Sequence, residues 1–276
     1  MRDAIHMAVR GRSVTGGRPP KWLDAATDIR LLGVSGDRDT QFRFEVPRLG
    51  EAAHELYDQP EFWSEKPDPE STGLDLLAEV VSEIDRGNEE SDRFDSHLLR
   101  RVSRFGRAVS AGFDEIVLDR SGGVHGAISQ RTIDMAESLR VETPPSRQVR
   151  IAGVLDMLRV STQTLALRLD GGEEIRGVLS ESVRPLTGLL DQRVVVFGRA
   201  VYRPSGRLLR IDVDAVETGE GASAFWSRVP KPSGVTRRPG ELRRPQTTRT
   251  GVAAFFGTWP GEETDAELLA ALRALG

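Results

Sequence analysis

Residues 164–179, "TLALRLDGGEEIRGVL", decide the fold of the C-terminal half of the body. Two runs with alternating apolar residues flank Asp-Gly-Gly, a sequence typical of the turn between two hairpin strands. A long strand over 149–160 precedes this hairpin, and a second hairpin over 193–217 follows it, turned by Pro-Ser-Gly. Five strands with a connection between the third and the fourth predict a small five-stranded β-barrel (OB-like) at 147–217. An SH3-like barrel is the alternative topology.

Upstream of the barrel, the pattern changes to helices mixed with short strands. Residues 29–49 predict a hairpin, with the alternating apolar residues of its second strand buried. Apolar residues recur at helical spacing in three later stretches, 68–87, 94–113 and 129–145. We therefore expect an α+β fold, in which residues 21–143 form a mixed α+β domain ahead of the barrel.

The composition limits the chemistry and the location of the chain. It has 276 residues, a net charge of −4 and no cysteine, which excludes disulfides, thiolate metal sites and a cysteine nucleophile. It has no run of 18 apolar residues and no signal-peptide core, so we expect a cytoplasmic protein that does not enter a membrane. Basic residues dominate both flanks, and we expect a flexible basic arm at 1–20 and a basic Pro/Arg-rich linker at 218–250.

No motif in the sequence indicates an enzyme. The four histidines do not form metal-ligand spacings, and the acidic residues lie in polar stretches that predict solvated loops. Neither a phosphate-binding glycine loop nor a G-x-S-x-G elbow occurs. We expect no catalytic residues, no metal ligands and no cofactor, although an unrecognised activity stays open. The oligomeric state also stays open.

Nucleic-acid binding by the barrel is the alternative function. Binders of single strands combine aromatic platforms with basic grooves, and this barrel has few aromatic residues and many acidic ones. The candidate residues for this function lie in the barrel and the linker: Tyr202, Arg203, Arg207, Arg210, Arg237, Arg238, Arg243 and Arg244.

The last 26 residues, "GVAAFFGTWPGEETDAELLAALRALG" (251–276), carry the strongest functional signal. Thr264 and Glu267 have the spacing of a capping box, and leucines follow at helical intervals. Aromatic anchors beside a short amphipathic helix are typical of a peptide that docks in a groove of a partner protein. Packing of this tail on its own body is the alternative. The predicted partner-binding residues are Phe255, Phe256, Trp259, Pro260, Leu268, Leu269, Leu272 and Arg273.

The tail also resembles a known family of peptides. Residues 255–275, "FFGTWPGEETDAELLAALRAL", resemble the C-terminal peptide of bacterial antitoxin-like proteins that accompany PIN-domain toxins. The pattern shared with that family is an aromatic residue and Gly, then Trp-Pro-Gly, Glu-Thr and a leucine-rich helix. The resemblance implies a protein partner, a PIN-type ribonuclease whose metal is held by acidic residues. It further implies that Arg273 or a linker arginine approaches that site.

Overall fold

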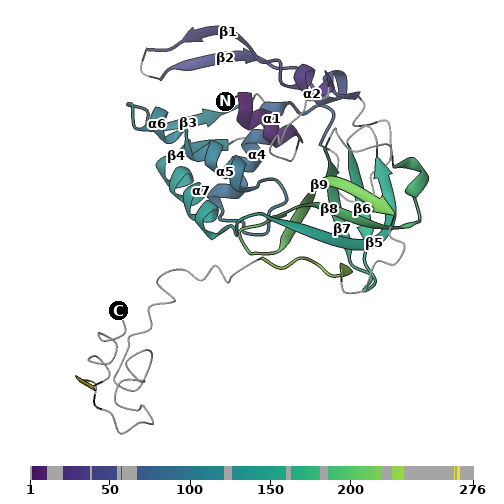
Figure 1. Ribbon diagram of the computed structural model, residues 1–276. Coiled ribbons are helices and arrows are strands. Elements are labelled where there is room, and N and C mark those ends of the chain that lie inside the picture. The colour runs from purple at the N-terminus through teal and green to yellow at the C-terminus, as the bar shows by residue number, and fades with distance from the viewer. Residues whose placement is uncertain are drawn as a thin grey trace. The chain divides into compact units, whose positions relative to one another are not determined.

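The computed structural model describes two units of the chain (Figure 1). They comprise residues 1–236 and 237–276, and each is described by itself. The residues described are 2–10, 21–37, 39–54, 57, 67–120, 126–159, 163–180, 186–218, 226–232, 264, 266 and 267. No helix within these ranges combines the length and the apolar character needed to cross a membrane.

The N-terminal part of the first unit is built mainly from helices, as the periodicity predicts. Its elements are α1 (Arg2–Arg10), α2 (Lys21–Ala26), α3 (Leu49–Ala52), α4 (Gly73–Asp85), α5 (Ser96–Ser103), α6 (Gly106–Val109) and α7 (Gln130–Glu142), with β3 (Glu115–Leu118) paired to β4 (Gly126–Ser129). Capping boxes begin the two longest helices, through Thr72 and Asp75 at α4 and through Ser129 and Thr132 at α7. Leu77 of α4 and Leu99 of α5 are completely buried in the core that α1, α4, α5 and α7 share.

Helix α1 corrects the expectation of a flexible arm over residues 1–20. Residues 2–10 are helical, and Ile5 is completely buried in the core of the helical part. Arginines stand at both ends of α1, but Ala4, Ile5 and Met7 give the helix a buried apolar face. Residues 11–20 lie outside the described ranges.

The hairpin of β1 (Arg30–Ser35) and β2 (Gln41–Glu45) is present, but the expected burial of its second strand is wrong. A register shift between Leu31 and Gly33 places Leu31 opposite Phe44 and Val34 opposite Phe42. Cross-strand partners share a face of the sheet, so the bulge gathers these four apolar residues on one side. Phe42 is nevertheless 52% exposed, and Leu31 and Val34 are exposed to a similar degree. The alternating pattern thus reflects an amphipathic hairpin with a solvent-facing apolar side.

The barrel confirms the predicted fold. It contains β5 (Arg147–Arg159), β6 (Thr164–Arg168), β7 (Glu174–Leu179), β8 (Arg193–Tyr202) and β9 (Leu208–Thr218), with the 3-10 turn η2 (Thr187–Leu189) between the third and fourth strands. These strands close in the order β5-β6-β7-β9-β8, and β8 pairs back with β5. The β7–β9 pair is parallel and the other pairs are antiparallel. This mixed, closed arrangement is OB-like.

The barrel interior consists of the alternate residues of each strand. Leu155 and Val194 are completely buried there, together with leucine, isoleucine and valine side chains from all five strands. Gly153 lets two strands approach closely, because a Cβ atom at this position would lie 2.7 Å from the backbone oxygen of Arg168. Apolar side chains line the interior, as expected for a barrel of this size.

Residues 226–232 correct the expectation that the whole of 218–250 is a solvated linker. The side chain of Arg150 stacks between two rings, with its Cζ atom 5.1 Å from the ring centre of Phe197 and 5.5 Å from that of Trp226. Ser227 is buried, and its Oγ accepts a 2.8 Å hydrogen bond from the backbone N–H of Asp170. The chain that leaves β9 is therefore fastened along the outside of the barrel before the second unit begins.

Candidate functional site

The barrel joins the helical part through a buried ionic contact centred on Arg210 of β9. Its Nη2 donates to Oδ2 of Asp95 over 2.6 Å, and its Nε donates to Oδ1 of Asp212 over 2.9 Å. The three side chains are 4%, 2% and 10% exposed. The other carboxylate oxygen of Asp95 accepts the backbone N–H groups of His97 and Leu98, each at 3.0 Å. One carboxylate thus caps helix α5 and binds the barrel.

The charges of this contact depend on one another. Burial by itself would raise the pKa of Asp95, but the charge of Arg210 and the hydrogen bonds from Arg210 and Leu98 hold that pKa below its usual value. Burial would likewise lower the pKa of Arg210, and Asp95 and Asp212 together raise it. Both groups are consequently charged in the folded protein, and removal of either partner would leave an uncompensated buried charge.

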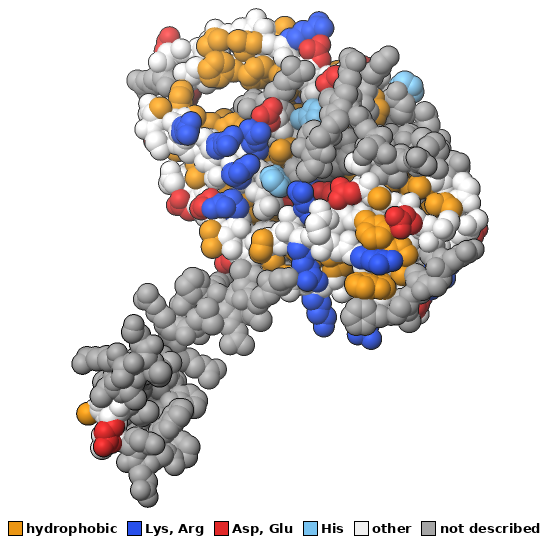
Figure 2. All heavy atoms as spheres, in the orientation of Figure 1, with side chains coloured by type: hydrophobic (Ala, Val, Ile, Leu, Met, Phe, Trp, Pro, Cys, Tyr) orange, Lys and Arg blue, Asp and Glu red, His pale blue; other side chains and the backbone are white. Residues whose placement is uncertain are grey.

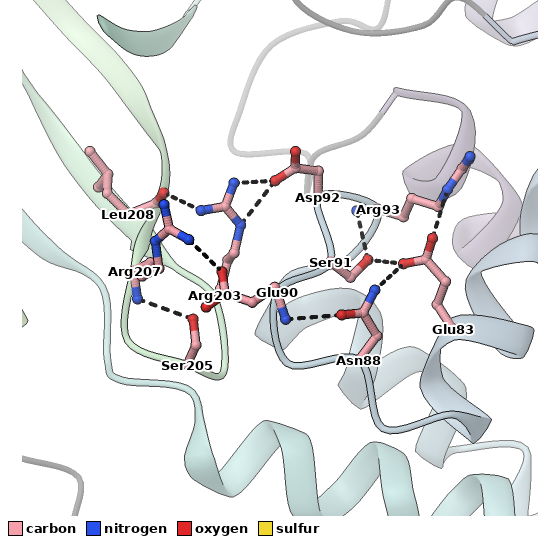
Figure 3. Close-up of polar contacts among 10 residues, drawn as sticks. All are labelled: Glu83, Asn88, Glu90, Ser91, Asp92, Arg93, Arg203, Ser205, Arg207 and Leu208. Carbon is pink, nitrogen blue, oxygen red and sulfur yellow. Dashed lines mark hydrogen bonds and ion pairs between the residues drawn. The ribbon is translucent and has the colours of Figure 1, made fainter. Parts of the chain in front are cut away.

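The acidic loop that precedes α5 continues this contact toward the surface (Figure 3). Arg203 pairs with Asp92 and also donates to the backbone oxygen of Leu208 over 2.8 Å. Arg207 reaches Glu90 at 3.4 Å, a longer and more exposed ion pair. The backbone N–H of Ser205 donates to the backbone oxygen of Glu89 over 3.3 Å. The turn between β8 and β9 is therefore held against residues 88–95.

Helix α4, which precedes the loop, also holds it through polar contacts. Oε1 of Glu83 on α4 accepts from Nε of Arg93 over 3.0 Å, and Ser91 pairs with the other carboxylate oxygen (Figure 3). The side-chain oxygen of Asn88 accepts the backbone N–H of Glu90 over 3.2 Å. Residues 88–90 and 92–93 are exposed, as the prediction of a solvated loop requires, and the stretch also supplies acidic partners to Arg203, Arg207 and Arg210.

These contacts remove Tyr202 and Arg210 from the nucleic-acid site predicted on the barrel. Tyr202 has no exposed surface, and its hydroxyl accepts a 3.2 Å hydrogen bond from Arg147, so its ring cannot stack on a base. Arg210 is buried, and Arg203 and Arg207 face carboxylates of the same chain. The sequence did not show that three of these arginines have acidic partners more than a hundred residues away. The predicted linker arginines, Arg237, Arg238, Arg243 and Arg244, lie outside the described residues.

The second unit is described at the start of the predicted terminal helix. The backbone N–H of Thr264 donates to Oε2 of Glu267 over 2.7 Å, and the Thr264 hydroxyl donates to the same oxygen over 2.8 Å. These two hydrogen bonds lower the pKa of Glu267, with that from the backbone as the larger cause. Ala266 and Glu267 are helical. This is the Glu-to-backbone half of the capping box that the sequence predicts.

The predicted docking side chains themselves lie outside the described residues. They are Phe255, Phe256, Trp259, Pro260, Leu268, Leu269, Leu272 and Arg273. Their part in partner binding therefore stays a prediction from the sequence.

Elsewhere in the described ranges, the side chains give little indication of a metal site or a ligand pocket. No group of three or more histidine, aspartate or glutamate side chains is placed there to hold a metal ion. A shallow hollow of about 340 Å³ lies between α4 and α7 and contains the carboxylate of Asp85. That carboxylate accepts from the Thr132 hydroxyl at 3.3 Å and faces Arg131 at 3.7 Å. These contacts link helix α4 to helix α7.

The chain was compared with protein-family models, curated proteins and solved structures, and none of the three comparisons finds a match.

Proposed function

We propose that this chain is a non-catalytic binding protein that engages a partner protein through residues 251–276. The partner that the tail pattern favours is a PIN-type ribonuclease toxin, which the chain would neutralise in the manner of an antitoxin. The observation that supports this most directly is the pair of hydrogen bonds from Thr264 to Glu267. They begin a helix at the position where the resemblance to antitoxin-like peptides requires one.

The tail has the physical properties of a segment that becomes fully ordered on a partner. Eleven residues lie between Thr264 and Gly276, fewer than the ~12–15 that an isolated helix needs to be stable in water. The leucines of this stretch recur at helical spacing, and two phenylalanines and a tryptophan precede them. Aromatic anchors of this kind commonly dominate binding energy at protein interfaces. A partner groove would supply the apolar surface that the short helix needs.

The body contributes a firm attachment point for the tail. Trp226 and Ser227 fasten the chain to the barrel, so the tether starts at a fixed place on a folded domain. Residues 233–250 then provide 18 residues, which can extend to about 60 Å. Such a tether raises the local concentration of the tail for a partner that also touches the body.

The experiment co-expresses a tagged version of the chain with the product of the neighbouring gene, which the proposal expects to be a PIN-type ribonuclease. Three forms are compared: the full chain, the chain ending at Thr250, and Trp259→Ala. We expect the full chain to capture the ribonuclease and suppress its activity, while the truncated form does neither and Trp259→Ala does so weakly. Phe42→Ala is a matched control, because it removes an exposed aromatic ring from the other unit. Equal capture by the full and truncated chains would show that the tail is not the docking element.

A further inference from the structure

Helices α5 and α6 present a line of basic side chains that composition alone does not reveal. Arg104 and Phe105, which separate the two helices, have helical backbone angles, with φ of −69° and −64° and ψ of −18° at both residues. Residues 96–109 therefore follow one nearly continuous helical path. His97, Arg100, Arg101, Arg104 and Arg107 recur on it every three or four residues. We call these five residues the arginine stripe.

The stripe and the core face divide the helix between them. At about 100° per residue, the stripe occupies an arc of roughly 120°, and the apolar residues of the same helix occupy the opposite arc. Leu98, Leu99 and Val102 are buried on that opposite side, and Phe105 and Val109 pack against the same core. Core packing thus fixes the rotation of the helix and turns the stripe toward solvent.

Within the described ranges, most of the stripe arginines have no acidic partner. Arg101 pairs with Asp3 of α1 at 3.0 Å. Arg100, Arg104 and Arg107 are exposed, and within the described ranges none of them has an ion-pair partner within 4.0 Å. In Figure 2, blue side chains gather on the part of the surface where Figure 1 labels these helices, with few red ones among them. Arg203, Arg207 and Arg210 of the barrel, in contrast, face acidic partners.

Buried contacts hold the N-terminus of the helix that carries the stripe. Asp95 caps the first turn of α5 and is itself held by the buried Arg210. Phe94, next to this cap, is 2% exposed and belongs to the core. A row of charges on such a rigid element needs little ordering to meet a rigid row of opposite charges.

We propose that the arginine stripe binds the phosphate backbone of duplex DNA. Residues 97–107 span about 15 Å along a helix axis, which matches roughly four base pairs at about 3.4 Å each. An α-helix fits between the backbones that border the wide major groove of B-DNA, but A-form RNA has a deep and narrow one. Recognition of a single strand would require aromatic platforms, and the stripe residues are four arginines and one histidine. Binding through phosphates alone is independent of sequence.

The salt dependence of binding tests this proposal. Each neutralised phosphate contributes about 0.9 to the slope of log affinity against log salt. In the full-length chain, the triple variant Arg100→Gln, Arg104→Gln and Arg107→Gln should therefore lower the magnitude of that slope by about 2.7. Between 50 and 200 mM salt, wild-type affinity for a labelled 20-base-pair duplex should then fall about 40-fold more than that of the variant. Lysine at the same three positions should retain the wild-type slope.

The controls separate the stripe from general charge. Arg43→Gln, Arg86→Gln and Arg199→Gln together remove three exposed charges from β2, the end of α4 and β8, and should leave the slope nearly unchanged. Circular dichroism checks that each variant is folded. If the triple variant unfolds, the single variant Arg104→Gln replaces it, with an expected slope change of about 0.9. The proposal is overturned if the wild-type chain does not bind the duplex. It is also overturned if the Gln variant of the stripe and the Gln control variant change the slope equally. Tighter binding to single-stranded DNA or duplex RNA than to duplex DNA would overturn the proposal as well. Binding to heparin without binding to duplex DNA would have the same meaning.

Discussion

Removal of Arg210 should be among the most destabilising single changes in the first unit. In Arg210→Ala, the carboxylates of Asp95 and Asp212 would remain buried, 2% and 10% exposed, without their cation. Loss of one partner from a buried ion pair typically costs about 3–5 kcal/mol, because the remaining charge is left without compensation. For a unit of this size, about 3–5 kcal/mol corresponds to a decrease of roughly 6–20 °C in Tm.

The assay is equilibrium unfolding of the full chain in urea, followed by circular dichroism, with Arg207→Ala as the matched control. Arg207 lies three residues earlier and its side chain is 74% exposed, with its carboxylate partner 3.4 Å away. An exposed pair of this kind contributes about 0–1 kcal/mol, so Arg207→Ala should unfold almost as wild type does. A loss at Arg210 no larger than that at Arg207 would refute the assigned role of the buried contact.

The pH dependence gives a second criterion. In wild type, the pKa of Asp95 is below its usual 3.8, so its contribution to stability is present above that value and is lost as the pH falls through the folded pKa. In Arg210→Ala, burial without the cation raises the folded pKa of Asp95, and protonation then relieves the penalty as the pH falls. The stability difference between the two proteins should therefore shrink between pH 7 and pH 4. A difference that stayed constant over this range would contradict the electrostatic cause.

Three further changes test other features of the body. Ile5→Ala should lower the free energy of unfolding by about 2–5 kcal/mol, because α1 is a core helix; a change near zero would restore the flexible arm. Trp226→Ala removes a ring that stacks on Arg150, worth about 1 kcal/mol, and should speed tryptic cleavage after Arg228 about fivefold; an unchanged cleavage rate would contradict the anchoring of this segment. Phe42→Thr should change stability by less than about 0.5 kcal/mol and reduce the binding of a fluorescent apolar dye; a large stability loss would place Phe42 in the core.

The barrel could be predicted from sequence because its information is local. The Asp-Gly-Gly and Pro-Ser-Gly turns specify which strands are neighbours, and the alternating apolar residues specify which side faces inward. The helices of the first part were predictable for the same reason, since capping residues such as Thr72 and Ser129 stand just before apolar runs of period 3.6. Each of these signals lies within one element or one turn.

The errors concern properties that depend on distant partners. Charges near the N-terminus obscured the three buried apolar residues of α1, whose burial depends on the later helices. Phe42 and Phe44 alternate like core residues, yet no element covers them in the described part of the chain, and alternation alone cannot show this. The arginine stripe could have been found by placing residues 97–107 on a helical wheel. Only the absence of acidic partners, which needs the fold, marks it as available.

The placement of acidic residues explains how one arginine-rich chain divides its charges between structure and surface. Residues 88–95 lie between α4 and α5 and supply carboxylates to Arg203, Arg207 and Arg210 of the barrel. The same loop ends at Asp95, where α5 and its exposed arginines begin. Each acidic residue used on the barrel side is one fewer available to neutralise the stripe on the helical side. The loop thereby joins the two parts of the first unit and leads directly into the helix that carries the stripe.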